Sequence, residues 1–232
     1  MNFEAIQTCL VTPHQLRQML ESEPLESWLT KSERSRLRSL RSPKRRTDWL
    51  TSRLAAKQLL RDYLNQTQNI LVKLNEIEIY NEASDAPAFN IIHHSRFSIV
   101  DVNISIAHSH GHGICALSEI EQVGYVGVDI EKIRPLSRGV LRKFLNKEEM
   151  IRLSRQPISD LCENAIAYWT IKEAALKSLR ANQSISLRDL RVSFKESGES
   201  SVSVADRRLQ LIARYWQWKD FAIAIAHRSA AA

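Results

Sequence analysis

Residues 168–179 read YWTIKEAALKSL, and this stretch decides how the chain around it folds. Lys, Glu, Ala and Leu dominate it and Gly and Pro are absent, so its helix propensity is high. At 3.6 residues per turn, Trp169, Glu173 and Lys177 fall on one side of the predicted helix, while apolar residues cover most of the rest. The helix therefore carries either an ordinary surface ion pair beside a packing tryptophan, or a carboxylate and an amine aimed at a ligand.

Strands and helices mix irregularly on both sides of this helix. The patterns predict helices over residues 14–22, 44–64, 140–154 and 160–179. They predict strands over residues 3–11, 76–80, 89–92, 102–118 (broken by a Gly-His loop) and 125–133. Four more strands follow, over LRVSF, SVSVA, LQLIARYWQW and FAIAIAH, with Lys219-Asp220 as the turn between the last two. Because there is no steady βαβ rhythm, the sequence indicates the α+β class.

The composition is that of an ordinary globular protein. The chain has 232 residues, of which 44% are hydrophobic and 25% charged, enough to bury the core of one large or two small domains. The sequence contains no apolar stretch long enough to span a bilayer, and the first sixteen residues lack the features of a signal peptide. Its three cysteines are widely separated, which is not the pattern of a disulfide framework or a zinc site. We therefore expect a cytoplasmic protein with no membrane partner.

Positive charge is concentrated in one part of the chain. The net charge is +7, and residues 31–61 hold eleven Lys or Arg but only two acids, Glu33 and Asp48. On the predicted helix 44–64, Arg46, Arg53 and Lys57 fall at nearly the same angle and form a basic stripe. Such a stripe is either a solvated helix face or a surface for an anion: nucleic acid, a phosphorylated cofactor or an acidic protein.

The predicted strand YVGVDIEKI carries two acids on one face. Because side chains alternate along a strand, Val126, Val128 and Ile130 point one way while Asp129 and Glu131 point the other. Two neighbouring carboxylates stay ionised together only beside a cation or basic groups, and their hard oxygen atoms suit Mg²⁺. The alternative is that the strand simply ends in solvent at these acids.

The three alternating histidines offer a competing metal site. His108, His110 and His112 have the spacing of ligands on one strand face, and imidazoles favour zinc, copper or nickel. Gly111 and Gly113 indicate a loop instead, so we expect His110 and His112 to be exposed. His108, beside the predicted strand, is the better candidate to contact an anionic ligand.

Three segments together resemble the Sfp-type 4′-phosphopantetheinyl transferases: GVDIEKIRP (127–135), WTIKEAALK (169–177) and ISIAHSHGHGICALS (104–118). The family's pattern is G-[VI]-D-[IV]-E, followed some forty residues on by W-x-x-K-E-A-x-x-K, and both motifs are complete here. The basic segment 45–60 also resembles the family's Arg-containing helix. The resemblance spans about residues 29–179.

This resemblance implies that the chain moves the phosphopantetheine arm of coenzyme A (CoA) to a serine of an apo acyl or peptidyl carrier protein and releases 3′,5′-ADP. It implies that Asp129, Glu131 and Glu173 hold Mg²⁺, with Mn²⁺ an open alternative. Lys177 would reach the CoA pyrophosphate. Glu173, or a metal-bound water that it orients, would take the serine proton.

The resemblance also implies where CoA binds. His108 matches the family's CoA-contacting histidine, which places it with Glu173 and Lys177 in the active site, and Arg46 and Arg53 would bind the CoA phosphates. Two departures affect the nucleotide end: the family's Gly-Lys-Pro reads Asp-Ala-Pro (85–87), and Ala107 replaces a serine. Other residues are therefore expected to hold the nucleotide, the candidates being Arg45, Lys57 and His110.

The implied fold has two similar α+β halves, 1–118 and 119–232, related by a pseudo-twofold axis with the ligand cleft between them. The implied protein is a monomer whose partner, a carrier protein, docks an acidic helix near a basic and apolar edge. The carrier can belong to fatty-acid, polyketide or peptide synthesis. Two alternatives stay open: a nucleic-acid-binding protein that uses residues 31–61, and an inactive homologue that binds carrier proteins.

Overall fold

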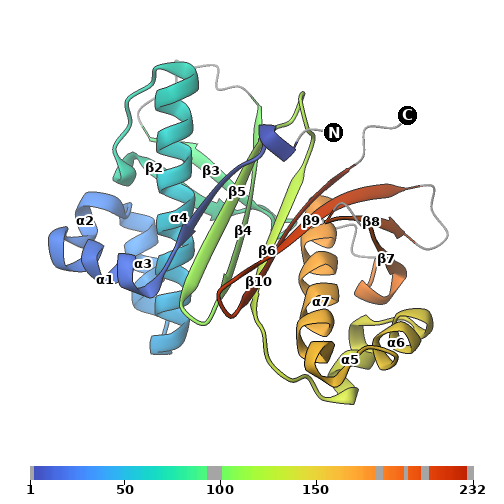
Figure 1. Cartoon of the computed structure of the whole chain (residues 1–232). Coiled ribbons are helices and arrows are strands. Elements are labelled where there is room, and N and C mark those ends of the chain that lie inside the picture. Colours follow the sequence, from blue (N-terminus) through green and yellow to red (C-terminus); the bar gives the residue numbers. More distant parts are fainter. Residues whose placement is uncertain (1–2, 93–100, 181–184, 196–197, 205–208, 229–232) are drawn as a thin grey trace. The chain divides into compact units, whose positions relative to one another are not determined.

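The computed structural model divides the chain into two compact units (Figure 1). We call Asn2–Gln122 the N unit and Val123–Ala232 the C unit. The structure describes residues 3–92, 101–180, 185–195, 198–204 and 209–228. Both units mix helices with antiparallel strands, which confirms the α+β class. The pseudo-twofold relation and the cleft stay predictions.

The N unit packs one long helix on a small antiparallel sheet. Its helices are α1 (Pro13–Ser22), α2 (Leu25–Trp28), α3 (Lys31–Ser39) and α4 (Pro43–Gln68), with short 3₁₀ turns at Phe3–Ala5 and Leu74–Glu76 (η2). Its strands are β1 (Gln7–Val11), β2 (Ile77–Asn81), β3 (Pro87–Ile91), β4 (Val102–Ser109) and β5 (His112–Glu119). The sheet has the order β1-β5-β4, β2 and β3 form a separate hairpin, and α4 lies against all three strands of the sheet.

Helix α4 has clear start and stop signals. The Ser42 side chain accepts a hydrogen bond from the backbone N–H of Arg45, and Pro43 stands at the first helical position, where its missing N–H costs nothing. The helix ends at Asn69, which has a left-handed backbone (φ 52°). A Cβ on Gly113 of β5 would lie 2.3 Å from the backbone nitrogen of Ser52, so only glycine permits this close approach of strand and helix.

The C unit also packs a long helix on an antiparallel sheet. Its helices are α5 (Arg138–Phe144), α6 (Lys147–Ser154) and α7 (Leu161–Ser178), with 3₁₀ turns at Ile158–Asp160 and Leu187–Asp189 (η4). Its strands are β6 (Val126–Lys132), β7 (Leu190–Phe194), β8 (Glu199–Val204), β9 (Gln210–Trp218) and β10 (Phe221–Arg228). The sheet order is β6-β10-β9-β8-β7, and α7 contacts β6, β10 and β9.

Two predicted elements need correction. The single helix expected over 140–154 is two helices, because Asn146 begins α6 with a capping box in which Asn146 and Glu149 each bond the other's backbone N–H. The strand expected over 3–11 begins only at Gln7, after a 3₁₀ turn. The last residue of the predicted strand SVSVA, Ala205, lies outside the described residues. Among the residues that are described, no helix is long and apolar enough to cross a membrane.

The faces of β6 are set by its contact with α7. A Cβ on Gly127 would lie only 1.9 Å from the carbonyl oxygen of Ala174, so this face of the strand meets the helix. Side chains alternate, and Asp129 and Glu131 therefore share the helix-facing side, while Val128 and Ile130 are buried on the other. The predicted alternation is confirmed, and the acids face α7.

Candidate functional site

An ion pair joins β6 to α7 in the C unit. The Asp129 carboxylate is buried, and its Oδ1 lies 2.7 Å from Nζ of Lys177. Nζ also donates to the carbonyl oxygen of Val128 at 3.0 Å. Lys177 stands in the last turn of α7, where the helix dipole favours a cation. The buried carboxylate is thus held by a charged partner, as a buried carboxylate must be.

Glu173 lies one turn before Lys177 and is half-buried. Burial raises the pKa of Glu173, the negative charge of Asp129 raises it further, and the positive charge of Lys177 lowers it. Because the charges of Asp129 and Lys177 both act on the pKa of Glu173, we treat these three residues as one electrostatic cluster, which we call the acidic cluster. The structure therefore brings together three of the residues that the sequence assigned to the active site.

The predicted magnesium site is only partly assembled. Glu131 shares the face of β6 with Asp129 and is half-buried, but within the described ranges no three His, Cys, Asp or Glu side chains are grouped to hold a metal ion. Asp129, Glu131 and Glu173 all offer carboxylate oxygens, the donors that Mg²⁺ prefers, so the donor chemistry fits. A cation binding here must share Asp129 with Lys177.

The two arginines of the basic helix differ in their surroundings. Arg46 lies in the first turn of α4 and is exposed. Arg53 is half-buried, its guanidinium carbon lies 5.2 Å from the centre of the Trp49 ring, and burial lowers its pKa. Arg46 thus has the accessibility that phosphate binding requires, whereas Arg53 is committed in part to stacking on tryptophan.

The predicted role of Lys57 is wrong. Its side chain is fully buried rather than part of a surface stripe, and Nζ lies 2.6 Å from Oε2 of Glu33. Nζ also donates to the carbonyl oxygens of Leu74, at 2.9 Å, and Ile77. Lys57 therefore serves the interior of the N unit and is not available to a nucleotide.

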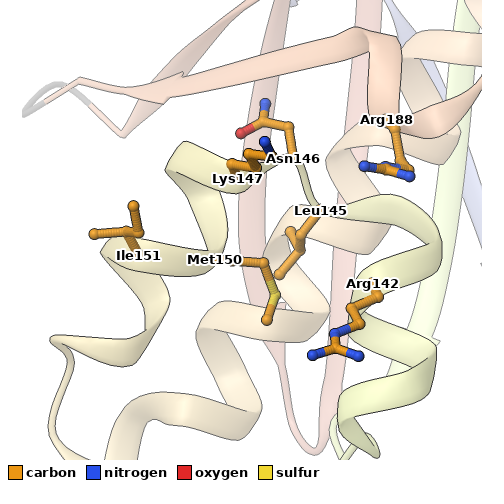
Figure 2. A pocket seen from close by; sticks show the side chains of 7 residues that line it. All are labelled: Arg142, Leu145, Asn146, Lys147, Met150, Ile151 and Arg188. Carbon is orange, nitrogen blue, oxygen red and sulfur yellow. The ribbon is translucent and has the colours of Figure 1, made fainter.

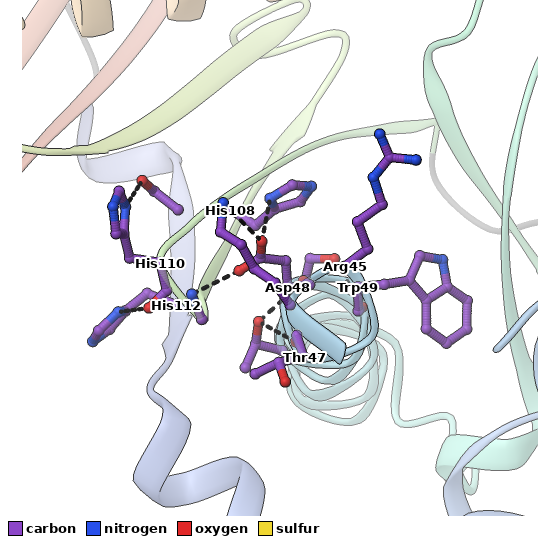
Figure 3. A network of polar contacts seen from close by, with 12 residues as sticks. Arg45, Thr47, Asp48, Trp49, His108, His110 and His112 are labelled. Atoms are coloured by element: carbon purple, nitrogen blue, oxygen red, sulfur yellow. Dashed lines mark hydrogen bonds and ion pairs between the residues drawn. The ribbon is translucent and has the colours of Figure 1, made fainter. Parts of the chain in front are cut away.

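His108 lies near the end of β4, in a network that Figure 3 shows. Its side chain is exposed, and Nδ1 lies 3.9 Å from Oδ2 of the buried Asp48 on α4. The other oxygen of Asp48 accepts a hydrogen bond from the backbone N–H of Gly111 at 2.6 Å. His110 is exposed as predicted, but His112 is half-buried. The histidines thus flank a tight turn that Asp48 supports.

Asp48 is a residue that the sequence reasoning missed. One signal was available: Glu33 and Asp48 are the two acids in the basic segment 31–61, and both are buried. An isolated acid in a strongly basic run has several possible cationic partners, and it is therefore a candidate for a buried, paired carboxylate.

A basic hollow of about 440 Å³ lies in the C unit (Figure 2). It is lined by three cationic side chains, a polar one and three apolar ones: Arg142, Lys147, Arg188, Asn146, Leu145, Met150 and Ile151. The hollow combines positive charge with an apolar lining, as a surface for an acidic amphipathic partner would.

The part of the chain that holds the acidic cluster is similar to a known protein family. Residues 125–226 match the family model described as the 4′-phosphopantetheinyl transferase superfamily. This confirms the resemblance that the sequence motifs predict. The matched range contains the acidic cluster and Glu131, but neither Arg46 nor His108.

Individual proteins similar to this chain are also named 4′-phosphopantetheinyl transferases. The chain is 26% identical to the 4′-phosphopantetheinyl transferase Sfp of Bacillus subtilis over 106 residues, which is 46% of each protein. It is 28% identical to the 4′-phosphopantetheinyl transferase gsp of Aneurinibacillus migulanus over 131 residues, or 54% of this chain and 47% of that one. The matches therefore span about half the length of these relatives.

Among solved structures, the holo-[acyl-carrier-protein] synthase of Helicobacter pylori in complex with coenzyme A aligns with a TM-score of 0.38 at 20% identity, covering 45% of this chain and 99% of that one. A Bacillus anthracis holo-(acyl-carrier-protein) synthase aligns with a TM-score of 0.39 at 22% identity, covering 49% of this chain and 92% of that one.

Proposed function

We propose that the chain is a 4′-phosphopantetheinyl transferase that moves the phosphopantetheine arm of CoA to a serine of an apo carrier protein. The observation that carries this proposal is the acidic cluster inside the matched range 125–226. A purely structural salt bridge needs one acid and one base, whereas this cluster holds a second carboxylate, Glu173, whose pKa is raised by burial and by the negative charge of Asp129. Such arrangements of like charge concentrate at functional sites.

The reaction requires one bond to form and one to break. The serine Oγ of the carrier bonds to the phosphorus that bears the pantetheine arm, and the bridging oxygen leaves with 3′,5′-ADP. The serine proton goes to a base, and we assign that role to Glu173 because it lies beside both Asp129 and Lys177. Lys177 would then stabilise the negative charge that develops on the leaving pyrophosphate oxygen.

Mg²⁺ is the divalent cation that the carboxylates would hold, and when bound it would neutralise phosphoryl charge as a Lewis acid. Asp129, Glu131 and Glu173 are its proposed ligands. The buried position of Asp129 on β6 places one proposed ligand on a strand, and Lys177 lies 2.7 Å from its carboxylate.

For CoA itself we propose Arg46 and His108 as phosphate contacts. Both side chains are exposed, and Arg46 offers the planar donor fork that suits phosphate oxygens. Arg53 stays a weaker candidate because it stacks on Trp49.

The carrier protein is the proposed partner of the basic hollow. Carrier proteins of this reaction present an acidic helix, and the hollow offers Arg142, Lys147 and Arg188 beside an apolar lining. We expect Arg188→Glu to raise the KM for the carrier about tenfold at low salt and to leave CoA affinity unchanged. Steady-state kinetics with varied carrier tests this, and a normal KM in the variant would move the docking site elsewhere. A monomeric state and a cytoplasmic location also stay predictions.

The proposed function is tested by following the small product. The protein is incubated with CoA, Mg²⁺ and an apo carrier, and 3′,5′-ADP is quantified by chromatography. We expect 3′,5′-ADP in proportion to carrier, and none with EDTA or with a carrier whose acceptor serine is replaced by alanine. If no 3′,5′-ADP forms with fatty-acid, polyketide and peptide carriers alike, the transferase proposal fails. A salt-dependent titration with nucleic acid would then test the alternative.

A further inference from the structure

We propose that Asp48 is a positioning residue for His108: its buried carboxylate sets which ring nitrogen of His108 faces the helix and which meets an anionic ligand. This inference rests on the proposed function for the identity of that ligand, CoA. The contact between Asp48 and His108 does not depend on the proposed function.

The carboxylate of Asp48 is buried and therefore needs hydrogen-bond or charged partners. Its side chain is 7% exposed on the second turn of α4, and burying a carboxylate without partners is costly. The Gly111 backbone N–H donates to Oδ1 at 2.6 Å. Lys44, the nearest lysine, is 72% exposed and its Nζ lies 4.0 Å from Oδ2, which makes it a weak partner. The partners that hold Asp48 therefore come from the turn between β4 and β5.

The turn between β4 and β5 is tight and packed. His110 and Gly111 both have left-handed backbone angles (φ 50° and 80°), as a two-residue hairpin turn requires. A Cβ on Gly111 would lie 3.1 Å from Cγ of Pro13, so the turn is packed as well as hydrogen-bonded. Asp48 Oδ1 thus holds the turn of the β4–β5 hairpin against α4.

His108 lies two residues before the turn. The pairing of β4 with β5 places it opposite Gly113, on which a Cβ would lie 2.3 Å from the backbone nitrogen of Ser52 on α4. Its Nδ1 faces Oδ2 of Asp48 at 3.9 Å. A carboxylate in that position favours a hydrogen on Nδ1, and it leaves Nε2 as the nitrogen that meets a ligand.

Charged and titratable neighbours share this region. Lys44 and Arg45 belong to the first turn of α4. His110 and His112 belong to the hairpin (Figure 3). The two hairpin histidines have local partners, since Nδ1 of His110 lies 3.0 Å from Oγ of Ser109 and Nδ1 of His112 lies 3.2 Å from the His110 carbonyl oxygen. Oδ2 of Asp48 lies 3.9 Å from Nδ1 of His108.

The test uses Asp48→Asn in the full-length protein. Asparagine still offers an oxygen to the Gly111 N–H, but it then turns an NH₂ group toward His108. Proton–nitrogen NMR on ¹⁵N-histidine protein, at a pH where the ring is neutral, reports the tautomer. We expect the Nδ1–H form in the unchanged protein and the Nε2–H form in Asp48→Asn. The same tautomer in both proteins would overturn the proposal.

Binding of 3′,5′-ADP, measured by calorimetry, gives the second readout. We expect Asp48→Asn and His108→Ala each to weaken binding about tenfold, and the double variant to bind no more weakly than His108→Ala alone. Additive losses would show that Asp48 acts through another group and would overturn the proposal. If the unchanged protein does not bind 3′,5′-ADP, the proposed function is contradicted, and the tautomer measurement still decides the role of Asp48. Equal thermal unfolding of Asp48→Asn and the unchanged protein confirms that folding is intact.

Discussion

The N unit and the C unit bury the same ion pair on the same kind of scaffold. In the N unit, Lys57 of α4 pairs with Glu33, and in the C unit Lys172 of α7 pairs with Glu149. The nitrogen–oxygen distance is 2.6 Å in both pairs, and all four side chains are almost completely buried. Desolvation lowers the pKa of both lysines, and the neighbouring glutamate raises it in both cases.

The hydrogen bonds around the two glutamates also correspond. Each is the third residue of a capped helix and accepts the backbone N–H of its cap, Thr30 or Asn146. Its second oxygen accepts a backbone N–H from a strand, at Ile79 of β2 or Val192 of β7. Each glutamate therefore ties a helix start, a strand and the central helix together.

The two lysines match in the same way. Each donates to the first carbonyl of a 3₁₀ turn, Leu74 of η2 or Leu187 of η4. The units thus share a buried polar link of one lysine, one glutamate and three corresponding backbone groups. Such a fully satisfied network specifies one arrangement of the elements around it.

The units differ at the next residue along the central helix. Lys57 is followed by Gln58, whose Oε1 lies 3.7 Å from Sγ of Cys9, whereas Lys172 is followed by Glu173 of the acidic cluster. The buried pair therefore supports the scaffold in both units, and the next side chain, a glutamate in the C unit only, carries the proposed chemistry.

The largest expected effect concerns Glu173, the position at which the two units differ. We expect Glu173→Gln to lower transfer to a carrier about 10²–10⁴-fold, because the proposed base is lost, while CoA affinity stays within about twofold. The matched control, Gln58→Glu, makes the opposite exchange at the corresponding position and should keep normal turnover. Single-turnover kinetics and calorimetry with CoA measure the two quantities. Normal turnover by Glu173→Gln would remove the assigned base.

Breaking the shared pair gives the next largest effect. Lys57→Met and Lys172→Met each leave a buried carboxylate without its cation, so we expect each to lower the free energy of unfolding by about 3–5 kcal/mol. Denaturant titration measures this loss, with Lys44→Met as an exposed-lysine control that changes little. A large loss in one variant and none in the other would break the equivalence of the two units.

The smallest expected effect lies at the helix starts. Thr30→Ala and Asn146→Ala each remove a cap that accepts the N–H of the paired glutamate, and each should cost about 1 kcal/mol. Thermal unfolding of both variants beside the unchanged protein measures it. Costs that differ by more than about 1 kcal/mol would mean that the capped glutamates are held differently in the two units.

Local rules predicted much of this structure from the sequence. Alternation along YVGVDIEKI correctly placed Asp129 and Glu131 on one face, and the motif beginning at Trp169 correctly indicated a helix. These signals work because each depends on residues within one element. The break at Asn146 was also readable, as N-x-x-E is a capping signal, but the sequence reasoning joined the flanking helices into one.

Contacts between elements were not predicted from the sequence. Lys57 has nearly the same helical angle as Arg46, which predicted a surface lysine. The angle does not show which turns of a helix are covered by neighbouring elements, and Lys57 is in fact buried. The pair of Asp48 and His108 joins residues sixty positions apart, and no spacing rule connects them. The Lys177–Asp129 bond likewise depends on packing α7 against β6.

Intact-protein mass spectrometry of the carrier tests the central claim most directly. An apo carrier protein is incubated with this protein, CoA and Mg²⁺, beside a sample with EDTA and a sample with Asp129→Asn. The account predicts a mass gain of one phosphopantetheine in the first sample and none in the other two. No gain with any class of carrier, or the same gain with Asp129→Asn, would contradict the assignment of transfer to the acidic cluster.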